Sequence, residues 1–206
     1  LHPPVSPPPC SGHALVYDGA RQRVVLFGGR VGQQVSDHTW EWDGQTWTRM
    51  NPQRSPTARE MHAMAYDAAR QRVVLFGGYG NSGYDESTWE WDGTTWTEAL
   101  PSSAPPPRSG HAMVYDHGRR RMVLFGGQDA SGVLDDTWEW DGVQWIQQFS
   151  RFTPLPRTRH AMGYFAANSR VVLFAGYSLT GAEDDTWLYS SLTPGRYQVL
   201  GTGCLV

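Results

Sequence analysis

Two sets of side chains recur along this 206-residue chain at a spacing that could bring them to a common site. Four histidines follow one another at intervals of 49 residues, and three arginines keep the same interval, each three residues before a histidine. These residues are His13, His62, His111 and His160, and Arg59, Arg108 and Arg157. Imidazole is a common metal ligand, and converging guanidinium groups bind carboxylates through paired hydrogen bonds. The residue types therefore suggest a metal ring or an anion site.

The regular spacing also gives both sets a structural interpretation. A histidine that occurs once per repeat could bond to the backbone of a neighbouring repeat and satisfy buried polar groups. We favour this role for the four histidines, and we expect neither a metal site nor another cofactor. Each arginine could instead pair with an acidic residue of its own or the next repeat, such as Glu41, Glu90 or Glu139. In the first repeat Cys10 stands in the place of the arginine.

Carboxylates and tryptophans recur with the same period. Acidic residues precede a tryptophan in every repeat, at Asp37, Glu86, Asp135, Asp136, Asp184 and Asp185. Paired carboxylates could serve acid–base catalysis or bind calcium, but the capping of loops by aspartate explains their recurrence better. The tryptophans could form a platform for a sugar, although packing between repeats is the stronger interpretation. They stand at Trp40, Trp89, Trp138 and Trp187. We therefore assign no catalytic residue.

The elements that must position these residues are four predicted strands in each repeat. The first strand begins at the histidine (residues 13–18 in the first repeat), and a polar turn leads to an apolar run, V-V-L-F or M-V-L-F, that is typical of a strand buried on both faces. The third strand alternates tryptophan and glutamate, and an Asp-Gly turn leads to a fourth strand with a second tryptophan. Paired glycines end the apolar strand at Gly28, Gly29, Gly77, Gly78, Gly126 and Gly127, and Ala175-Gly176 holds the matching place in the fourth repeat.

The repeat also predicts the fold class and the domain organisation. Four antiparallel strands repeated in tandem indicate an all-β protein, a β-propeller in which each four-stranded sheet is one blade. We expect one propeller domain over residues 10–200, after a proline-rich arm at 1–9 and before a tail at 201–206. Its four blades either close a small ring or form part of a larger one. The repeats cover approximately residues 10–58, 59–107, 108–156 and 157–200.

These repeats resemble Kelch repeats, the blades of Kelch-type and galactose-oxidase-like propellers. The resemblance rests on the double glycine after an apolar strand, an aromatic residue of the D-x-x-W type and the second tryptophan, and it covers roughly residues 10–190. It implies that the first strand lines the central axis and that the arginine before it faces a pocket on one side of the ring. On that basis we predict ligand contacts at the channel mouth from Arg59, Arg108, Arg157 and the adjacent Ser109.

The fourth repeat departs from the pattern. Phe165 replaces the aspartate that ends the first strand, and Pro194 stands at the position that matches Trp145. We expect residues 196–200 to supply its outer strand, because a diverged terminal repeat is typical of a cap. If four blades close the ring, the repeat places Cys204 near the position equivalent to Cys10. A disulfide between Cys10 and Cys204 would then join the ends; two unrelated cysteines are the alternative.

The loops after the glycines differ from repeat to repeat, so ligand specificity would be encoded there. The candidate specificity residues are Arg30, Tyr79, Asn81, Gln128, Asp129 and Tyr177. The sequence contains no nucleophile elbow, phosphate-binding loop, dinucleotide fingerprint or HExxH motif. We therefore predict a non-catalytic module that binds a protein or a small ligand. The alternatives are a sugar-handling enzyme or carbohydrate-binding domain, since Kelch-like propellers include oxidases and sugar isomerases, and a structural spacer.

Composition restricts the partners further. A net charge of −3 gives no electrostatic reason to expect nucleic acid or an anionic membrane as a partner. No run of 18 apolar residues is present, so we expect no membrane span. The first residue is Leu1 and no signal-peptide pattern is visible. We expect part of a longer, secreted bacterial protein with an extracellular or periplasmic location.

Overall fold

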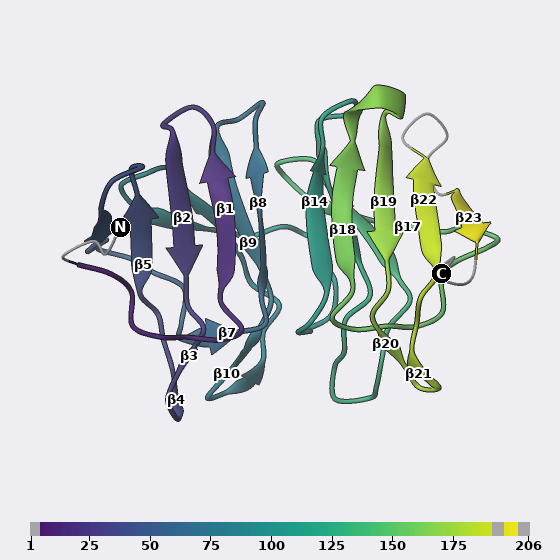
Figure 1. Cartoon of the computed structure of the whole chain (residues 1–206), viewed down its shortest axis with the longest axis horizontal. Coiled ribbons are helices and arrows are strands. Elements are labelled where there is room, and N and C mark those ends of the chain that lie inside the picture. Colours follow the sequence, from purple (N-terminus) through teal and green to yellow (C-terminus); the bar gives the residue numbers. More distant parts are fainter. Residues whose placement is uncertain (1–4, 191–195, 202–206) are drawn as a thin grey trace. The chain divides into compact units, whose positions relative to one another are not determined.

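The computed structural model describes residues 5–190 and 196–201. In these residues the chain is all-β apart from one short 3-10 helix, η1 (Ala166–Asn168), and its strands form repeated four-stranded antiparallel sheets (Figure 1). The predicted fold class, an all-β chain built from propeller-type blades, is therefore confirmed. The chain divides into two compact units, Leu1–Leu100 and Pro101–Val206. The first unit holds repeats 1 and 2, and the second holds repeats 3 and 4.

The first unit contains two antiparallel sheets, one from each repeat. The sheet of repeat 1 runs in the order β1 (Ala14–Asp18), β2 (Arg23–Phe27), β5 (Thr39–Trp42) and β6 (Trp47–Arg49). The sheet of repeat 2 consists, in the same order, of β8 (Ala63–Asp67), β9 (Arg72–Phe76), β12 (Thr88–Trp91) and β13 (Trp96–Ala99). Each predicted strand of the repeat is thus present.

The second unit repeats this arrangement. Repeat 3 forms β14 (Ala112–Asp116), β15 (Arg121–Phe125), β16 (Thr137–Trp140) and β17 (Trp145–Gln148). Repeat 4 forms β18 (Ala161–Phe165), β19 (Arg170–Phe174), β22 (Thr186–Ser190) and β23 (Tyr197–Gly201). The expected outer strand of the fourth repeat is present in β23, one residue later than predicted.

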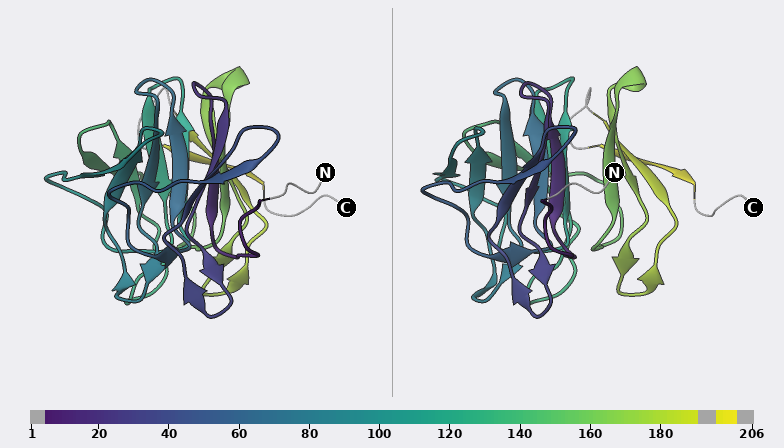
Figure 2. Two further views of the ribbon diagram at one scale, coloured as in Figure 1. Left: turned by 90° about the vertical axis from the view of Figure 1, so that its left-hand side faces the viewer. Right: turned by 60° about the vertical axis from the view of Figure 1, so that its left-hand side comes forward.

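Small hairpins follow the second strand in repeats 1, 2 and 4, whereas the corresponding loop of repeat 3 has the isolated bridge between Gln128 and Val133. In each unit they extend from the end of the sheets at which the first strand begins (Figures 1 and 2). They are β3 (Arg30–Val31) with β4 (Gln34–Val35), β10 (Tyr79–Gly80) with β11 (Gly83–Tyr84), and β20 (Tyr177–Ser178) with β21 (Gly181–Ala182). In repeat 2 the hairpin also pairs with β7 (Arg59–Glu60), which forms a three-stranded sheet.

Each unit has one apolar core between its two sheets. In the first unit Val25 and Phe27 of β2 pack with Val73 and Leu75 of β9 and with the tryptophans of β12 and β13. In the second unit the equivalent cluster contains Val123, Phe125, Val171, Leu173, Tyr189 and Tyr197. The prediction that these aromatic residues pack between repeats therefore holds for Trp89 and its neighbours. A single blade could not bury both of its apolar faces, whereas two stacked blades bury the faces between them.

Hydrogen bonds join the two sheets of each unit at equivalent positions. Glu41 accepts the indole N–H of Trp91 at 2.8 Å, and Thr39 accepts that of Trp96 at 2.9 Å. In the second unit Glu139 accepts the Tyr189 hydroxyl at 2.6 Å, and the Thr137 and Tyr197 hydroxyls are 3.0 Å apart. Since these groups are buried, each pair satisfies polar atoms that would otherwise cost free energy to bury. Tyr197 thus takes the structural place of Trp96, although Pro194 matches it by residue count.

The paired glycines allow neighbouring repeats to approach closely. A Cβ on Gly28 would lie 2.6 Å from the carbonyl oxygen of Arg59, and a Cβ on Gly126 would lie 2.6 Å from that of Arg157. The next glycine of each pair donates its N–H to the same carbonyl, from Gly29 at 2.8 Å and from Gly127 at 2.9 Å. The glycines therefore define the contact between repeats.

No helix in the described part of the chain could cross a membrane.

Candidate functional site

Two of the four histidines, His62 and His160, pack between neighbouring repeats. The His62 ring meets Phe27 of repeat 1 edge-on with 5.5 Å between ring centroids, and His160 meets Phe125 of repeat 3 at 5.4 Å. Each ring also faces the backbone of the preceding repeat, at Phe27 for His62 and at Phe125 for His160, as expected from the sequence, but the ring nitrogens make no hydrogen bond of good geometry. Among the described residues, no group of three or more histidine, cysteine, aspartate or glutamate side chains is arranged to hold a metal ion.

Burial changes the protonation of two of these rings. Burial and, to a smaller extent, the positive charges of Arg59 and His13 lower the pKa of His62 to about 3, against an opposing effect of the Phe27 backbone. The pKa of His160 falls to about 4 for the same reasons, with Arg157 as the nearby cation. Both imidazoles are therefore neutral at physiological pH.

The three arginines are buried in the structure and their charges are paired. Arg59 is 1% exposed, and Arg108 and Arg157 are 0% exposed. Each donates its Nε–H to a backbone carbonyl two residues earlier and an Nη1–H to the carbonyl of the first residue at the double-glycine position. Their acidic partners are Asp85, Asp136 and Asp185.

The expected pairing of each arginine with an acidic residue of its own repeat is therefore confirmed, but the examples named from the sequence, Glu41, Glu90 and Glu139, were wrong. Those glutamates pair with arginines of the first hairpin turn, Arg21, Arg70 and Arg119. The physical reason is one of distance along the blade: the third-strand glutamates lie beside the hairpin turn, whereas the buried arginines precede the first strand at the other end. Ligand contact by Arg59, Arg108 and Arg157 stays a prediction. Most N–H donors of these three guanidinium groups are already bonded to protein acceptors.

Two of the three ion pairs are two-point contacts. Arg108 donates from Nη1 and Nη2 to the two oxygens of Asp136, and Asp136 Oδ2 also accepts the Trp138 indole N–H at 2.7 Å. Arg157, Asp185 and Trp187 repeat this geometry. Because Arg157 donates to it, the pKa of Asp185 is lowered. In both repeats the two carboxylate oxygens are engaged by protein donors.

Repeat 2 differs because its acid is displaced. Ser87 stands where the other repeats have Asp136 and Asp185, and the carboxylate comes from Asp85, two residues earlier. Arg59 Nη1 donates to Asp85 Oδ1 at 2.9 Å, while Arg59 Nη2 turns to the Thr57 hydroxyl at 2.9 Å. Ser87 donates to the same Asp85 Oδ1 through both its N–H and its hydroxyl. Within the described chain Asp85 Oδ2 accepts no hydrogen bond, and the Asp85 side chain is 28% exposed, against 18% for Asp136 and 9% for Asp185.

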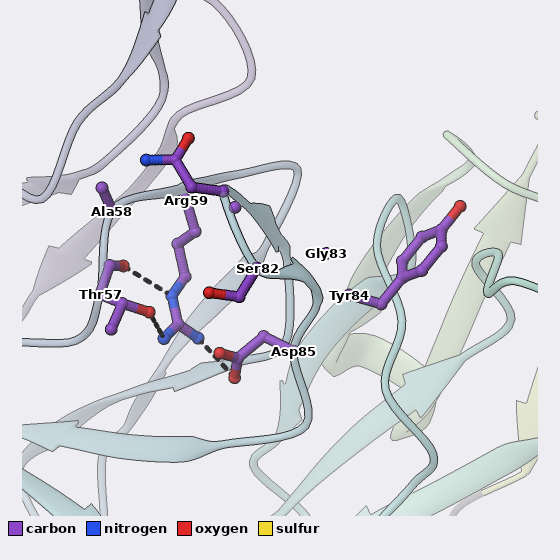
Figure 3. A pocket seen from close by; sticks show the side chains of 9 residues that line it. Thr57, Ala58, Arg59, Ser82, Gly83, Tyr84 and Asp85 are labelled. Carbon is purple, nitrogen blue, oxygen red and sulfur yellow. Dashed lines mark hydrogen bonds and ion pairs between the residues drawn. The ribbon is translucent and has the colours of Figure 1, made fainter.

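A pocket of about 320 Å³ lies at this displaced carboxylate (Figure 3). It is formed by the segment before the first strand and by the β10–β11 hairpin, and it is lined by Thr57, Ala58, Arg59, Gly80, Asn81, Ser82, Gly83, Tyr84 and Asp85. We call it the repeat-2 pocket. It brings together Arg59, a predicted ligand-binding residue, and Asn81, a predicted specificity residue.

Backbone pairing and an ion pair hold together the strands that carry Arg59 and Gly80 of the repeat-2 pocket. Gly80 pairs with Arg59 across β10 and β7, and a Cβ on Gly80 would lie 2.5 Å from the Ala58 carbonyl oxygen. On the adjoining strand Glu60 forms an ion pair with Arg30 of repeat 1, at 2.6 Å between Nη2 and Oε1. Arg30 therefore fixes the neighbouring hairpin to the strand that carries Arg59.

Polar side chains lie near the open carboxylate of Asp85, and an aromatic pair lies farther from it. The Ser82 hydroxyl lies on the same side of the pocket as Asp85, whereas Tyr84 extends away from the Arg59–Asp85 pair (Figure 3). The Tyr84 ring meets Tyr79 edge-on with centroids 5.0 Å apart, and Tyr79 is 41% exposed. The pocket thus offers a carboxylate oxygen, hydroxyl groups and an adjacent tyrosine pair.

The other predicted site residues lie outside this pocket. Gln128 pairs by its backbone with the buried Ser109, and Tyr177 pairs with Thr158 in the same way. Asp129, a predicted specificity residue, caps its own loop: its Oδ1 accepts hydrogen bonds from Ser131 and Gly132, and these bonds lower its pKa. Cys10 Sγ lies 3.4 Å from His13 Nδ1. The predicted disulfide involves Cys204, which lies outside the described residues.

Sequence reasoning missed Thr57, Ser82, Tyr84 and Asp85. One signal was present, because repeat 2 has S-T-W where repeats 3 and 4 have D-T-W. An ion pair that is retained without the aspartate at that position requires another acid nearby, and Asp85 provides it. Glu86, the acid chosen from the sequence, is an exposed neighbour.

Comparisons with known proteins add no assignment: no family model matches the chain, and no curated protein shows significant similarity to it. The candidate site therefore rests on its own geometry. That geometry can hold a ligand by hydrogen bonds and charge at Asp85 and by contact with the tyrosine pair.

Proposed function

We propose that this chain is a Kelch-type repeat protein that acts as a binding module without catalysis, and that the repeat-2 pocket is its ligand site. One observation carries the proposal. The Asp85 side chain is 28% exposed at the wall of a pocket and no donor of the described residues engages its Oδ2, whereas the equivalent acids Asp136 and Asp185 are engaged at both oxygens. A carboxylate oxygen that the fold does not use is available to a ligand.

The arrangement of the pocket favours recognition over a purely structural role. Its hydroxyl and amide side chains come from the β10–β11 hairpin, whose sequence differs from the hairpins of the other repeats. Variable loops on a rigid scaffold are where binding residues concentrate in proteins. The short strand β7 and the Arg30–Glu60 pair hold this loop in place, so little conformational entropy is lost when a ligand binds.

Unbiased selection against the purified chain tests this proposal. We expect a library of random heptapeptides or an array of glycans to yield ligands that bind the wild type, and the Asn81→Ala/Ser82→Ala variant to lose them. Both side chains are exposed, so the variant keeps its fold. Ser131→Ala is the matched control, because Ser131 is the equivalent of Ser82 in repeat 3. Ligands that the pocket variant retains in full would show that the site lies elsewhere.

A further inference from the structure

The accessible charge in the repeat-2 pocket is negative. Arg59 is 1% exposed, and its donors go to Thr57, Gly77, Asp85 and Ser87, whereas the Asp85 side chain is 28% exposed. A ligand that enters therefore meets the carboxylate and not the guanidinium. This reverses the charge preference that three converging arginines suggested.

Other carboxylates of the described chain lie near Arg59. Burial lowers the pKa of Arg59, and the negative charges of Asp85 and Glu98 oppose that effect, which places both acids in its vicinity. Glu60 is compensated by Arg30, and Glu86 adds an exposed carboxylate beside Asp85. One buried cation thus faces an excess of negative charge, and a positively charged ligand would restore the balance.

From these observations, and resting on the function proposed above, we infer that the repeat-2 pocket binds a cationic nitrogen group, a guanidinium or an ammonium. Such a group donates to Asp85 Oδ2, the oxygen that no described protein donor engages. Charge-assisted hydrogen bonds of this kind are stronger than neutral ones. The shared chemistry belongs either to an arginine or lysine side chain of a peptide or to a free small amine. The exposed Tyr79 beside Tyr84 offers additional contact surface to the peptide form.

A charge series on one probe tests the inference without altering the protein. The probe is acetyl-Gly-Gly-Arg-Gly-Gly-amide, with lysine, citrulline or glutamate in place of arginine, and binding is measured by calorimetry at low salt. Citrulline keeps the shape of arginine and removes its charge. We expect the arginine or lysine peptide to bind at least about tenfold more tightly than the citrulline and glutamate peptides. Equal affinity for arginine and citrulline would overturn the inference.

Two protein variants identify the carboxylate. Asp85→Asn should abolish the preference for arginine over citrulline. The matched control is Glu86→Gln, which removes the neighbouring exposed charge and should leave the preference within about twofold. If Glu86→Gln removes the preference and Asp85→Asn does not, the assignment to Asp85 is wrong.

Two further results distinguish a free amine from a peptide side chain as the source of the cationic group, and this inference from the proposed function. Agmatine, a free guanidinium compound, should bind as well as the peptide if the natural ligand is a small amine, and much more weakly if the peptide backbone and the tyrosine pair contribute. The agmatine result decides only between these two sources, whereas the comparison of arginine with citrulline decides whether the charge is recognised. Selected ligands that carry no basic group but depend on Asn81 and Ser82 would overturn this inference and leave the proposed function standing, whereas failure to select any ligand would count against both.

Discussion

Arg59 contacts Asp85 at one point, from Nη1 to Oδ1 at 2.9 Å, and leaves Asp85 Oδ2 without a donor in the described chain. In repeat 3 Arg108 grips both oxygens of Asp136, and Trp138 donates to one of them. The same arginine position therefore supports a closed ion pair in one repeat and an open one in another. A difference of two residues in the position of the acid accounts for this, because Asp85 approaches from the hairpin and Asp136 from the residue before the third strand.

This difference predicts unequal effects on stability. Asp136→Asn leaves the fully buried Arg108 without its counter-charge, and it should lower the free energy of unfolding by about 3 kcal/mol. Asp85→Asn removes one contact and leaves Arg59 bonded to Thr57, Gly77 and Ser87 at a more exposed site, so its cost should be about 1 kcal/mol. Urea denaturation followed by tryptophan fluorescence measures both. Equal losses of unfolding free energy would show that the two ion pairs contribute equally to stability.

The glycine contact between repeats gives a second prediction. Gly126→Ala should destabilise the protein by about 2 kcal/mol or more, because φ is +60° there and the new Cβ would lie 2.6 Å from the Arg157 carbonyl oxygen. Gly163→Ala is the control, since nothing lies within 4 Å of a Cβ at that position. The thermal midpoints of the two variants should differ by several degrees. A neutral Gly126→Ala variant would show that the repeats do not approach so closely.

Stability should decrease at mildly acidic pH. The pKa of His62 is about 3 in the folded protein and that of His160 is about 4, both below the ordinary value of 6.5. Between those values the unfolded chain binds more protons than the folded one, so the free energy of unfolding falls as the pH is lowered from about 6.5 to about 4. Each histidine contributes a slope of at most about 1.4 kcal/mol per pH unit.

The variant His62→Gln isolates this effect from general acid sensitivity. It removes one of the two groups and should reduce the pH dependence of the thermal midpoint between pH 6.5 and 4. His13→Gln changes the same repeat position where the side chain is exposed, and it should alter the pH dependence much less, because His13 only adds to the effect of burial on the pKa of His62. A pH profile that is the same in all three proteins would rule out buried neutral histidines as its cause.

The fourth repeat supplies a prediction about Tyr197. Its hydroxyl lies 3.0 Å from the Thr137 hydroxyl and is buried, so Tyr197→Phe should cost about 1 kcal/mol by leaving Thr137 without this partner. Thr137→Val should cost a similar amount. In a double-mutant cycle the two changes together should cost clearly less than their sum. Additive costs would separate Tyr197 from the role that Trp96 has in the first unit.

Local patterns in the sequence were sufficient to predict the strands. The apolar run before each double glycine, the alternation in T-W-E-W and the Asp-Gly turns are all short-range signals, and the structure forms β2, β5 and their counterparts from them. The outer strand of repeat 4, Tyr197–Gly201, was also predicted within one residue. It alternates less regularly than the other strands, but it follows a proline-glycine pair in the sequence.

The partners of side chains could not be predicted in the same way. Arg108 was matched with Glu139 by charge alone, whereas the fold places Glu139 near Arg119 and brings Asp136 to Arg108. Counting by 49 assigned Pro194 to the place that Tyr197 occupies, because Tyr197 pairs with a residue eight positions earlier, Tyr189, whereas Trp96 pairs with a residue five positions earlier, Trp91. The open carboxylate of Asp85 depends on both a displaced residue and a changed hydrogen-bond partner, and neither follows from the period of the repeat.

The residues that build the blade are separable from those that bind the ligand. Giving repeat 2 the acid position of repeat 3 tests this claim. The variant Asp85→Leu/Ser87→Asp gives repeat 2 the residues of repeat 3, Leu134 and Asp136, at the matching positions. Calorimetric titration with the arginine peptide should show binding to the wild type and none to this variant, while the free energy of unfolding stays within about 1 kcal/mol. Undiminished binding by the folded variant would contradict the account.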